Sequence, residues 1–316
     1  MFVCRALAFQ FLIIFGHSTE ECYFSEIERP LVNTLLNRLL QSAEDDSTIP
    51  DPAAFLALRL ANQHNLKGEL RFQQRLTEIA VRKVIEGEDF PIGPTALYTL
   101  AFRSACLDPA YISDGHSHIN LVKPLGDKLK QEIQNLELNR QPLTDYYQLT
   151  LAVLALCIEK QPVSTYVVEK LIGSIMNYEA PFGEVFLVDT ASMSVLALSC
   201  LHRSPINDIP RLKIEKAIVR LLLEILATKH EDGTIGTTDN TGLAVQALIV
   251  NQQLKFQQFQ CSDYVAKLIS EIPKGTFDSV QKISRVIPAL EGRTYLDAQS
   301  LDCSSDQDNL PQENES

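Results

Sequence analysis

Hydrophobic residues recur along this chain in six apolar segments, each about one helix long and each centred on a small alanine. The six alanines are separated by 44, 54, 42, 50 and 42 residues, and they are Ala57, Ala101, Ala155, Ala197, Ala247 and Ala289. Spacing of this size fits one helical hairpin, and a single hairpin cannot bury its apolar face alone. The repeat therefore predicts six stacked hairpins, an all-α fold that we expect to close into an (α/α)6 barrel.

The six segments are apolar on nearly all sides, as in LTLAVLALCI at 149–158, so we expect an inner ring of helices buried on both faces. Stretches with charge on one side only predict an outer ring, and they include 66–84, 125–138, 162–176 and 209–228. If each outer helix returns the chain to the same end, all inner helices run in parallel. Their amino ends then meet at one mouth, where unpaired N–H groups and positive dipole ends suit amide or phosphate groups of a ligand.

The two ends of the chain differ from the repeats. Residues 1–18 contain Arg5, an apolar run at 6–15, and small residues Gly16 and Ser18, which is the pattern of a secretory signal peptide. The run is shorter than the roughly 20 residues that a membrane-spanning helix needs. Residues 304–316 are polar and acidic without apolar periodicity, so we expect a disordered tail or a linker after a barrel domain at 19–303.

Charge and cysteine content narrow the class of protein further. The formal net charge of -12 disfavours nucleic acid and anionic membranes as partners, because both repel an acidic surface. Six cysteines follow the predicted signal peptide, and an even number in a secreted chain predicts disulfides, although spacing alone allows 15 pairings. The His116-Ser117-His118 pair has no further ligand at a suitable spacing, so we expect a solvated loop rather than a metal site.

Polar residues just before the inner segments are the candidate ligand contacts. Thr144, Tyr147 and Gln148 lie before one segment, and Asp145 with Gln148 resembles a capping box. Asp189 either caps the next inner helix or points into the mouth. Asn240 is a plausible N-cap of the inner helix that follows it.

The motifs of common enzymes are absent from the sequence: it has no GxSxG elbow, HExxH, phosphate loop or dinucleotide glycine pattern. We therefore expect no enzyme. Because helical barrels also host glycosidases and isoprenoid enzymes, a hydrolase or cyclase remains a remote alternative. It would use carboxylates at the mouth, and the candidates are Asp145, Glu184, Asp189, Asp232 and Asp239.

Four stretches carry a resemblance to a known family, and they are LTDYYQLTLAVLALC at 143–157, VDTASMSVLALSCL at 188–201, DGTIGTTDNTGLAVQAL at 232–248 and ISRVIPALEGRTYLD at 283–297. From about residue 21 to 303 the chain resembles the vitamin B12 carriers, the family of transcobalamin, intrinsic factor and haptocorrin. The resemblance implies a ring of six inner and six outer helices. It also implies cobalamin or a corrinoid as a ligand rather than a catalytic cofactor. The implied disulfides are Cys22–Cys261, Cys106–Cys303 and Cys157–Cys200.

The resemblance also implies ligand contacts. Thr144, Tyr147, Gln148 and Asp189 match polar positions that contact the corrin ligand in the family, and Asn240 matches another with a changed side chain. The chain departs from the family at Pro94 and Arg285, where glutamine is usual, and at Thr237, where asparagine is usual. Residues 183–187 contain no histidine, the residue with which transcobalamin can ligate cobalt, so no metal ligand is expected from the protein.

Length is the largest departure from the family pattern. The family continues past the position of Cys303 into a smaller β-rich domain that covers the other face of the ligand, whereas this sequence ends at Ser316. We therefore expect a secreted corrinoid carrier that binds more weakly than its two-domain relatives, with a cell-surface receptor or a separate β-domain chain as further partners. The alternative is a carrier or interaction protein of the same fold that no longer binds cobalamin.

Overall fold

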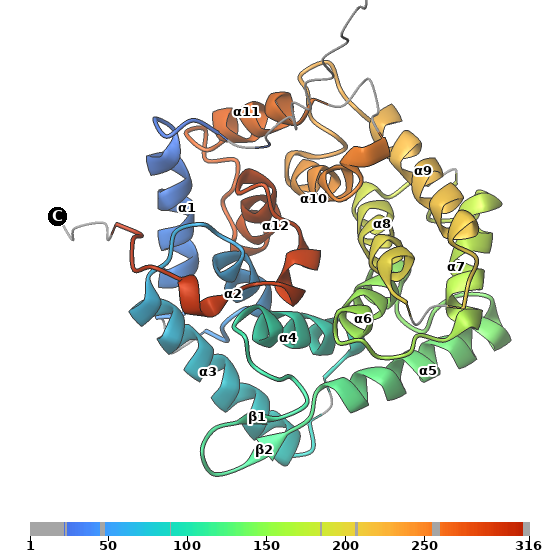
Figure 1. The fold of residues 1–316 in the computed structure, drawn as a ribbon, viewed down its shortest axis with the longest axis horizontal. Coiled ribbons are helices and arrows are strands. Elements are labelled where there is room, and N and C mark those ends of the chain that lie inside the picture. The colour runs from blue at the N-terminus through green and yellow to red at the C-terminus, as the bar shows by residue number, and fades with distance from the viewer. Residues whose placement is uncertain are drawn as a thin grey trace, which may run out of the picture.

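Two concentric rings of helices make up the described part of the chain (Figure 1). The computed structural model describes residues 22, 24–44, 48–88, 90–183, 185–205, 208–254 and 260–311. The inner helices are α2 (Pro52–Arg59), α4 (Ile92–Ser104), α6 (Tyr146–Ile158), α8 (Val188–Arg203), α10 (Thr238–Ile249) and α12 (Val280–Leu290). The outer helices are α1 (Arg29–Gln41), α3 (Leu66–Ile85), α5 (Val122–Asn139), α7 (Thr165–Met176), α9 (Arg211–Ala227) and α11 (Cys261–Glu271).

Each inner helix packs against the next one, and α12 packs against α2, so the ring closes. This confirms the predicted (α/α)6 barrel. The six repeat alanines are all fully buried, and every residue from Leu149 to Ile158 of α6 is buried as well. A helix with neighbours on all sides needs small residues where the backbones approach, which explains the recurring alanine.

The inner helices run in parallel, as the contacts at their two ends establish. At their amino ends, Gly93 near the start of α4 lies against Gln148 in the first turn of α6, and Arg285 in the middle of α12 reaches Asp239 in the first turn of α10. At their carboxyl ends, the Arg103 side chain of α4 bonds to Glu159 after α6, with Nε and Oε1 2.6 Å apart. The mouth predicted from the alternation of inner and outer segments therefore exists.

Short elements complete the described residues. Strands β1 (Ile112–Ser113) and β2 (His118–Ile119) form an antiparallel hairpin, and the 3-10 helices are η1 (Gln252–Leu254), η2 (Tyr295–Gln299) and η3 (Cys303–Ser305). The histidine pair lies in this hairpin, where the His118 ring stacks on Tyr111 at 4.8 Å between centroids. Among the described residues, no helix is both long and apolar enough to cross a membrane.

Three disulfides fasten the barrel, with the pairings that the family resemblance implies: Cys22–Cys261, Cys106–Cys303 and Cys157–Cys200. Cys157–Cys200 joins the adjacent inner helices α6 and α8, whereas the other two close loops of 239 and 197 residues. Removing a native disulfide from a secreted domain typically costs about 2 to 5 kcal/mol.

Residues 304–311, for which the sequence predicts a disordered tail or a linker, make specific contacts with the barrel. Asp306 bonds to the buried Arg59 and lies 3.5 Å from His64 Nε2. The backbone N–H groups of Asn309 and Leu310 donate to the His64 carbonyl, and Leu310 is buried. A short polar segment can be ordered when distant residues supply its partners, and composition alone does not reveal such partners. The predicted signal peptide at residues 1–18, Glu184 and residues 312–316 lie outside the described residues.

Candidate functional site

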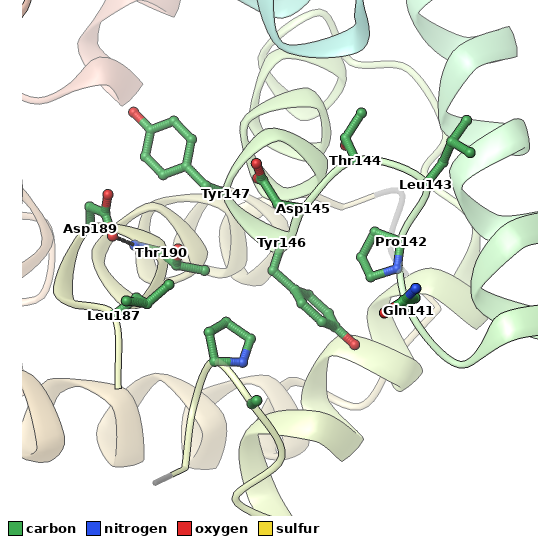
Figure 2. A pocket seen from close by; sticks show the side chains of 12 residues that line it. Gln141, Pro142, Leu143, Thr144, Asp145, Tyr146, Tyr147, Leu187, Asp189 and Thr190 are labelled. Atoms are coloured by element: carbon green, nitrogen blue, oxygen red, sulfur yellow. Dashed lines mark hydrogen bonds between the residues drawn. The ribbon is translucent and has the colours of Figure 1, made fainter. Parts of the chain in front are cut away.

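A cavity of about 540 Å³ lies where the amino ends of α6 and α8 meet (Figure 2). Its lining consists of residues 141–147, 180–181, 187 and 189–190. Thr144, Tyr147 and Asp189 are three of the predicted contacts that the fold brings to this cavity. Figure 2 shows Tyr146 and Tyr147 pointing in opposite directions from the first turn of α6, as expected for adjacent helical residues.

Asp145 is the N-cap of α6, as the sequence predicts. It has an extended backbone, and its Oδ1 accepts the Gln148 backbone N–H at 2.7 Å. The Gln148 amide returns a bond of 3.0 Å to Asp145 Oδ2 rather than to the backbone, so the pair is not a full capping box. Gln148 also lies directly against Gly93 of α4, where a Cβ would be 2.8 Å from its Oε1. The amide is therefore held between two inner helices.

Thr144 is bonded to a side chain that the sequence analysis missed. Its hydroxyl donates to Glu132 Oε1 at 2.7 Å, and its backbone N–H donates to Glu132 Oε2 at 3.1 Å. Glu132 is buried in α5 on the same stripe as Leu125, Leu129 and Leu136. A charged residue at an apolar position of an amphipathic helix was the signal that could have identified it.

Asp189 is the second residue of α8, whose N-cap is Leu187. The interpretation of Asp189 as an N-cap is therefore wrong. Its Oδ1 accepts the Thr190 backbone N–H at 2.8 Å, and the carboxylate lies half-buried beside the cavity. The positive end of the α8 dipole favours a negative charge at this position.

Thr237, rather than Asn240, caps α10, so the capping interpretation of Asn240 is wrong. The Thr237 hydroxyl accepts the Asn240 backbone N–H at 3.3 Å and donates to Asp239 Oδ1 at 2.8 Å. Arg285 of α12 reaches this turn, where its Nη1 lies 3.2 Å from Asp239 Oδ2 and 3.4 Å from Asn240 Oδ1. The predicted contacts Thr237, Asn240 and Arg285 therefore form one cluster around Asp239.

Arg285 connects that cluster to the cavity, because its Cζ lies 5.9 Å from the centroid of the Tyr147 ring. Burial raises the pKa of Tyr147, and the Arg285 charge opposes this only in part. Burial also works against the Arg285 charge, but the neighbouring tyrosines and Asp239 outweigh it and raise the pKa of the guanidinium. At neutral pH the mouth therefore presents a neutral phenol beside a charged guanidinium.

Two further tyrosines and a carboxylate lie close enough to interact with the charges of the mouth: Tyr295 with Arg285 and Asp51, and Tyr98 with Asp51. Burial, followed by the nearby Asp51 charge, raises the pKa of Tyr98 to about 12. Burial likewise raises the pKa of Tyr295, and Tyr147 adds to this effect. Asp51 caps α2 by accepting the Ala53 backbone N–H at 2.8 Å, and burial raises its pKa. The two phenols remain protonated hydrogen-bonding groups at physiological pH.

Gln246 is a second residue that the sequence analysis missed. It is fully buried in α10, its Oε1 accepts the Tyr295 backbone N–H at 3.2 Å, and its Nε2 donates to the Arg285 carbonyl at 3.2 Å. A polar amide within the apolar segment TGLAVQALIV was the visible signal. Gln246 therefore fixes the backbone that carries Arg285.

The arrangement suits a large ligand with an apolar body and polar substituents. Phenol, hydroxyl, amide and carboxylate groups line the cavity together with the apolar side chains of Pro142, Leu143 and Leu187, and the Arg285 guanidinium lies beside the Tyr147 ring. This combination is typical of small-molecule sites. Among the described residues, no group of three or more His, Cys, Asp or Glu side chains is placed to hold a metal ion. Such a site can bind and orient a ligand through hydrogen bonds.

Comparison with known proteins places the chain in a family. A family model described as eukaryotic cobalamin-binding protein matches residues 4–316. Human transcobalamin-1 is 35% identical over 290 residues, covering 88% of this chain and 64% of that protein. Human transcobalamin-2 is 31% identical over 314 residues, covering 94% of this chain and 71% of that protein. Human cobalamin binding intrinsic factor is 27% identical over 306 residues, covering 94% of this chain and 67% of that protein.

The fold is similar to that of a solved relative. The crystal structure of haptocorrin in complex with Cbi matches with a TM-score of 0.75 and 31% identity, covering 91% of this chain and 73% of that chain. The sequence thus spans about two-thirds of the length of these relatives. The chain belongs to the family of eukaryotic cobalamin-binding proteins.

Proposed function

We propose that this chain binds cobalamin or a related corrinoid at the mouth of the barrel, as a carrier and without catalysis. The observation that carries the proposal is the convergence of Tyr147, Asp189 and Arg285 from three different inner helices. A corrin ring has an apolar body with amide side chains around it. Donors and acceptors around an apolar cavity match that chemistry.

A carrier fits the mouth better than a hydrolase or cyclase, because three of the four candidate carboxylates in the described residues already have partners. Asp145 caps α6, Asp239 pairs with Arg285, and Asp232 lies 2.9 Å from Lys267 Nζ. A glycosidase requires two carboxyl groups that are not engaged elsewhere, one acting as the acid and the other as the base or nucleophile. Under the carrier proposal, Asp189→Asn changes ligand affinity and no turnover is found on glycoside or isoprenoid substrates.

The proposal predicts that the chain retains cobalamin on gel filtration at micromolar protein and shifts the visible spectrum of aquocobalamin. If a correctly disulfide-bonded sample shows neither of these two effects, the proposal is contradicted.

We also propose that the protein is secreted, on the basis of the signal-peptide pattern at residues 1–18. Expression in a secretory cell line should release the protein into the medium with Thr19 as its first residue. Retention inside the cell with residues 1–18 intact would contradict this proposal. A receptor at the cell surface, if one exists, would be sought with this secreted form.

A second candidate is a carrier of the same fold that holds a different amphipathic ligand. The observation that favours it is the Arg285–Asp239 ion pair, which places opposite charges at the mouth. Mass spectrometry of small molecules extracted from the secreted protein separates the two candidates. A corrinoid mass supports the first, and a reproducible non-corrinoid mass supports the second.

A further inference from the structure

Arg285 is held in place more firmly than an exposed arginine at a cavity mouth usually is. Its backbone carbonyl accepts the Gln246 amide at 3.2 Å, and α10 approaches so closely that a Cβ on Gly242 would lie 2.7 Å from that carbonyl oxygen. Its side chain is fixed by Asp239 and Asn240, and 29% of it is exposed. A guanidinium prepared in this way loses little conformational entropy when a ligand binds.

The chemistry of this group restricts what it can bind. A guanidinium donates hydrogen bonds and accepts none, whereas an amide side chain does both. The two bonds to α10 both leave from Nη1, and Tyr147 also interacts with the guanidinium, so the Nε–Nη2 edge takes no part in the bonds to α10. That edge has the fork geometry that matches a carboxylate in bidentate fashion, and charged partners strengthen such bonds.

We infer that Arg285 is a specificity-determining residue that favours corrinoids carrying a carboxylate over those carrying only amides at the periphery. The inference rests on the proposed function, since it concerns the preference of the same mouth. Asp189 repels an anionic ligand whether residue 285 is arginine or glutamine, whereas Asp239 loses its ion-pair partner in Arg285→Gln. The affinities are therefore also compared in an Asp239→Asn background, where the coupling between the arginine and the ligand carboxylate is visible in a ratio of affinities from which the repulsion by Asp189 cancels.

The test uses cyanocobalamin and the isomeric monocarboxylic acids that are obtained from it when one peripheral amide is hydrolysed. Equilibrium dialysis measures Kd for every ligand with the wild type, Arg285→Gln and Arg285→Lys, at constant salt. The measured ratio is the Kd of cyanocobalamin divided by the Kd of a monocarboxylic acid. For at least one of these acids, the ratio should be at least ten times larger in the wild type than in Arg285→Gln. Arg285→Lys should lie between them, because it keeps the charge and loses the fork. Arg211→Gln on the exposed surface of α9 is the matched control and should leave the ratio unchanged.

The outcomes separate this inference from the proposed function. Binding of cyanocobalamin with ratios that are the same in the wild type and Arg285→Gln for every isomer would overturn the inference and leave the proposed function standing. Binding of none of the ligands by the wild type would overturn both. Circular dichroism and unfolding of Arg285→Gln verify that a changed ratio does not come from a misfolded sample.

Discussion

Gly242 of α10 lies directly against the backbone of Arg285 in α12. A Cβ at Gly242 would lie 2.7 Å from the Arg285 carbonyl oxygen and 2.8 Å from the Cα of Val286. Both obstacles are backbone atoms, so they cannot move aside without shifting a helix. This close approach brings the Arg285 guanidinium within reach of Asp239 and Asn240 and so builds one side of the mouth.

Gly242→Ala is therefore expected to destabilise the barrel by about 1 to 3 kcal/mol, the usual range for an overpacked core. It should also weaken ligand binding, because α12 moves relative to α10. Urea unfolding measures the first effect. Gly126→Ala in α5 is the control, since nothing lies within 4 Å of a Cβ there. If Gly242→Ala and Gly126→Ala have the same free energy of unfolding, α10 and α12 are not as closely packed at Gly242 as the structure indicates.

Gly93→Ala tests the placement of Gln148. Here the obstacle is the flexible end of a side chain, because the added Cβ meets Gln148 Oε1 at 2.8 Å. The amide should swing away from α4 with little change in the free energy of unfolding, and corrinoid affinity should fall several-fold. Gly173→Ala in α7, where a Cβ meets open space, provides the comparison. An unchanged Kd in Gly93→Ala would remove Gln148 from the set of ligand contacts.

Glu271 at the end of α11 gives a pH-dependent prediction. Bonds from Lys267, Lys274 and Thr276 lower the pKa of its carboxyl from 4.5 to about 2. A carboxyl whose pKa is lower in the folded protein adds stability above its unfolded pKa, and this stability is lost as the pH falls through the folded pKa. Glu271→Gln should thus be less stable than the wild type at pH 7. The difference should shrink between about pH 4.5 and pH 2. A difference that stays constant over this window would contradict the assignment.

Asp306 should stabilise the barrel through Arg59, which is buried and also bonds to Glu69 at 2.6 Å. Asp306→Ala removes one charged partner of this guanidinium, and the loss of such a bond costs about 1.5 to 3 kcal/mol. Proteolysis within residues 304–311 should become faster at the same time. Asp127→Ala serves as the control, because its bond to Lys130 is exposed and screened by solvent and should contribute little to stability. Similar losses in both variants would argue against a specific role for Asp306.

The fold could be predicted because its signal is repeated and local. The alanine spacing and the all-round apolar character of segments such as 149–158 follow from the ring itself, in which every inner helix has neighbours on all sides. The cap at Asp145 was equally accessible, since its bond reaches only three residues along the chain. Of the two interpretations of Asp189, the N-cap is wrong because α8 begins one residue before it, and helix boundaries are poorly specified by sequence.

The parts that could not be predicted depend on distant partners. Glu132 and Thr144 meet only after α5 and α6 have packed, and Gln246 acquires its role from the Tyr295 and Arg285 backbones. The order of residues 304–311 likewise depends on Arg59 and His64, some 240 residues earlier. Amino-acid composition contains no information on these long-range bonds. For this reason the polar composition of residues 304–311 predicts a tail or a linker.

Equilibrium dialysis of labelled cobalamin against the folded chain tests the central claim most directly, when it compares the wild type with variants at the two ends of the barrel. The account predicts saturable binding of one ligand per chain. Tyr147→Ala should weaken it tenfold or more, whereas Arg103→Gln at the opposite end should leave it unchanged. Absence of saturable binding in the wild type, or equal losses in both variants, would contradict a corrinoid site at the mouth formed by the amino ends of the inner helices.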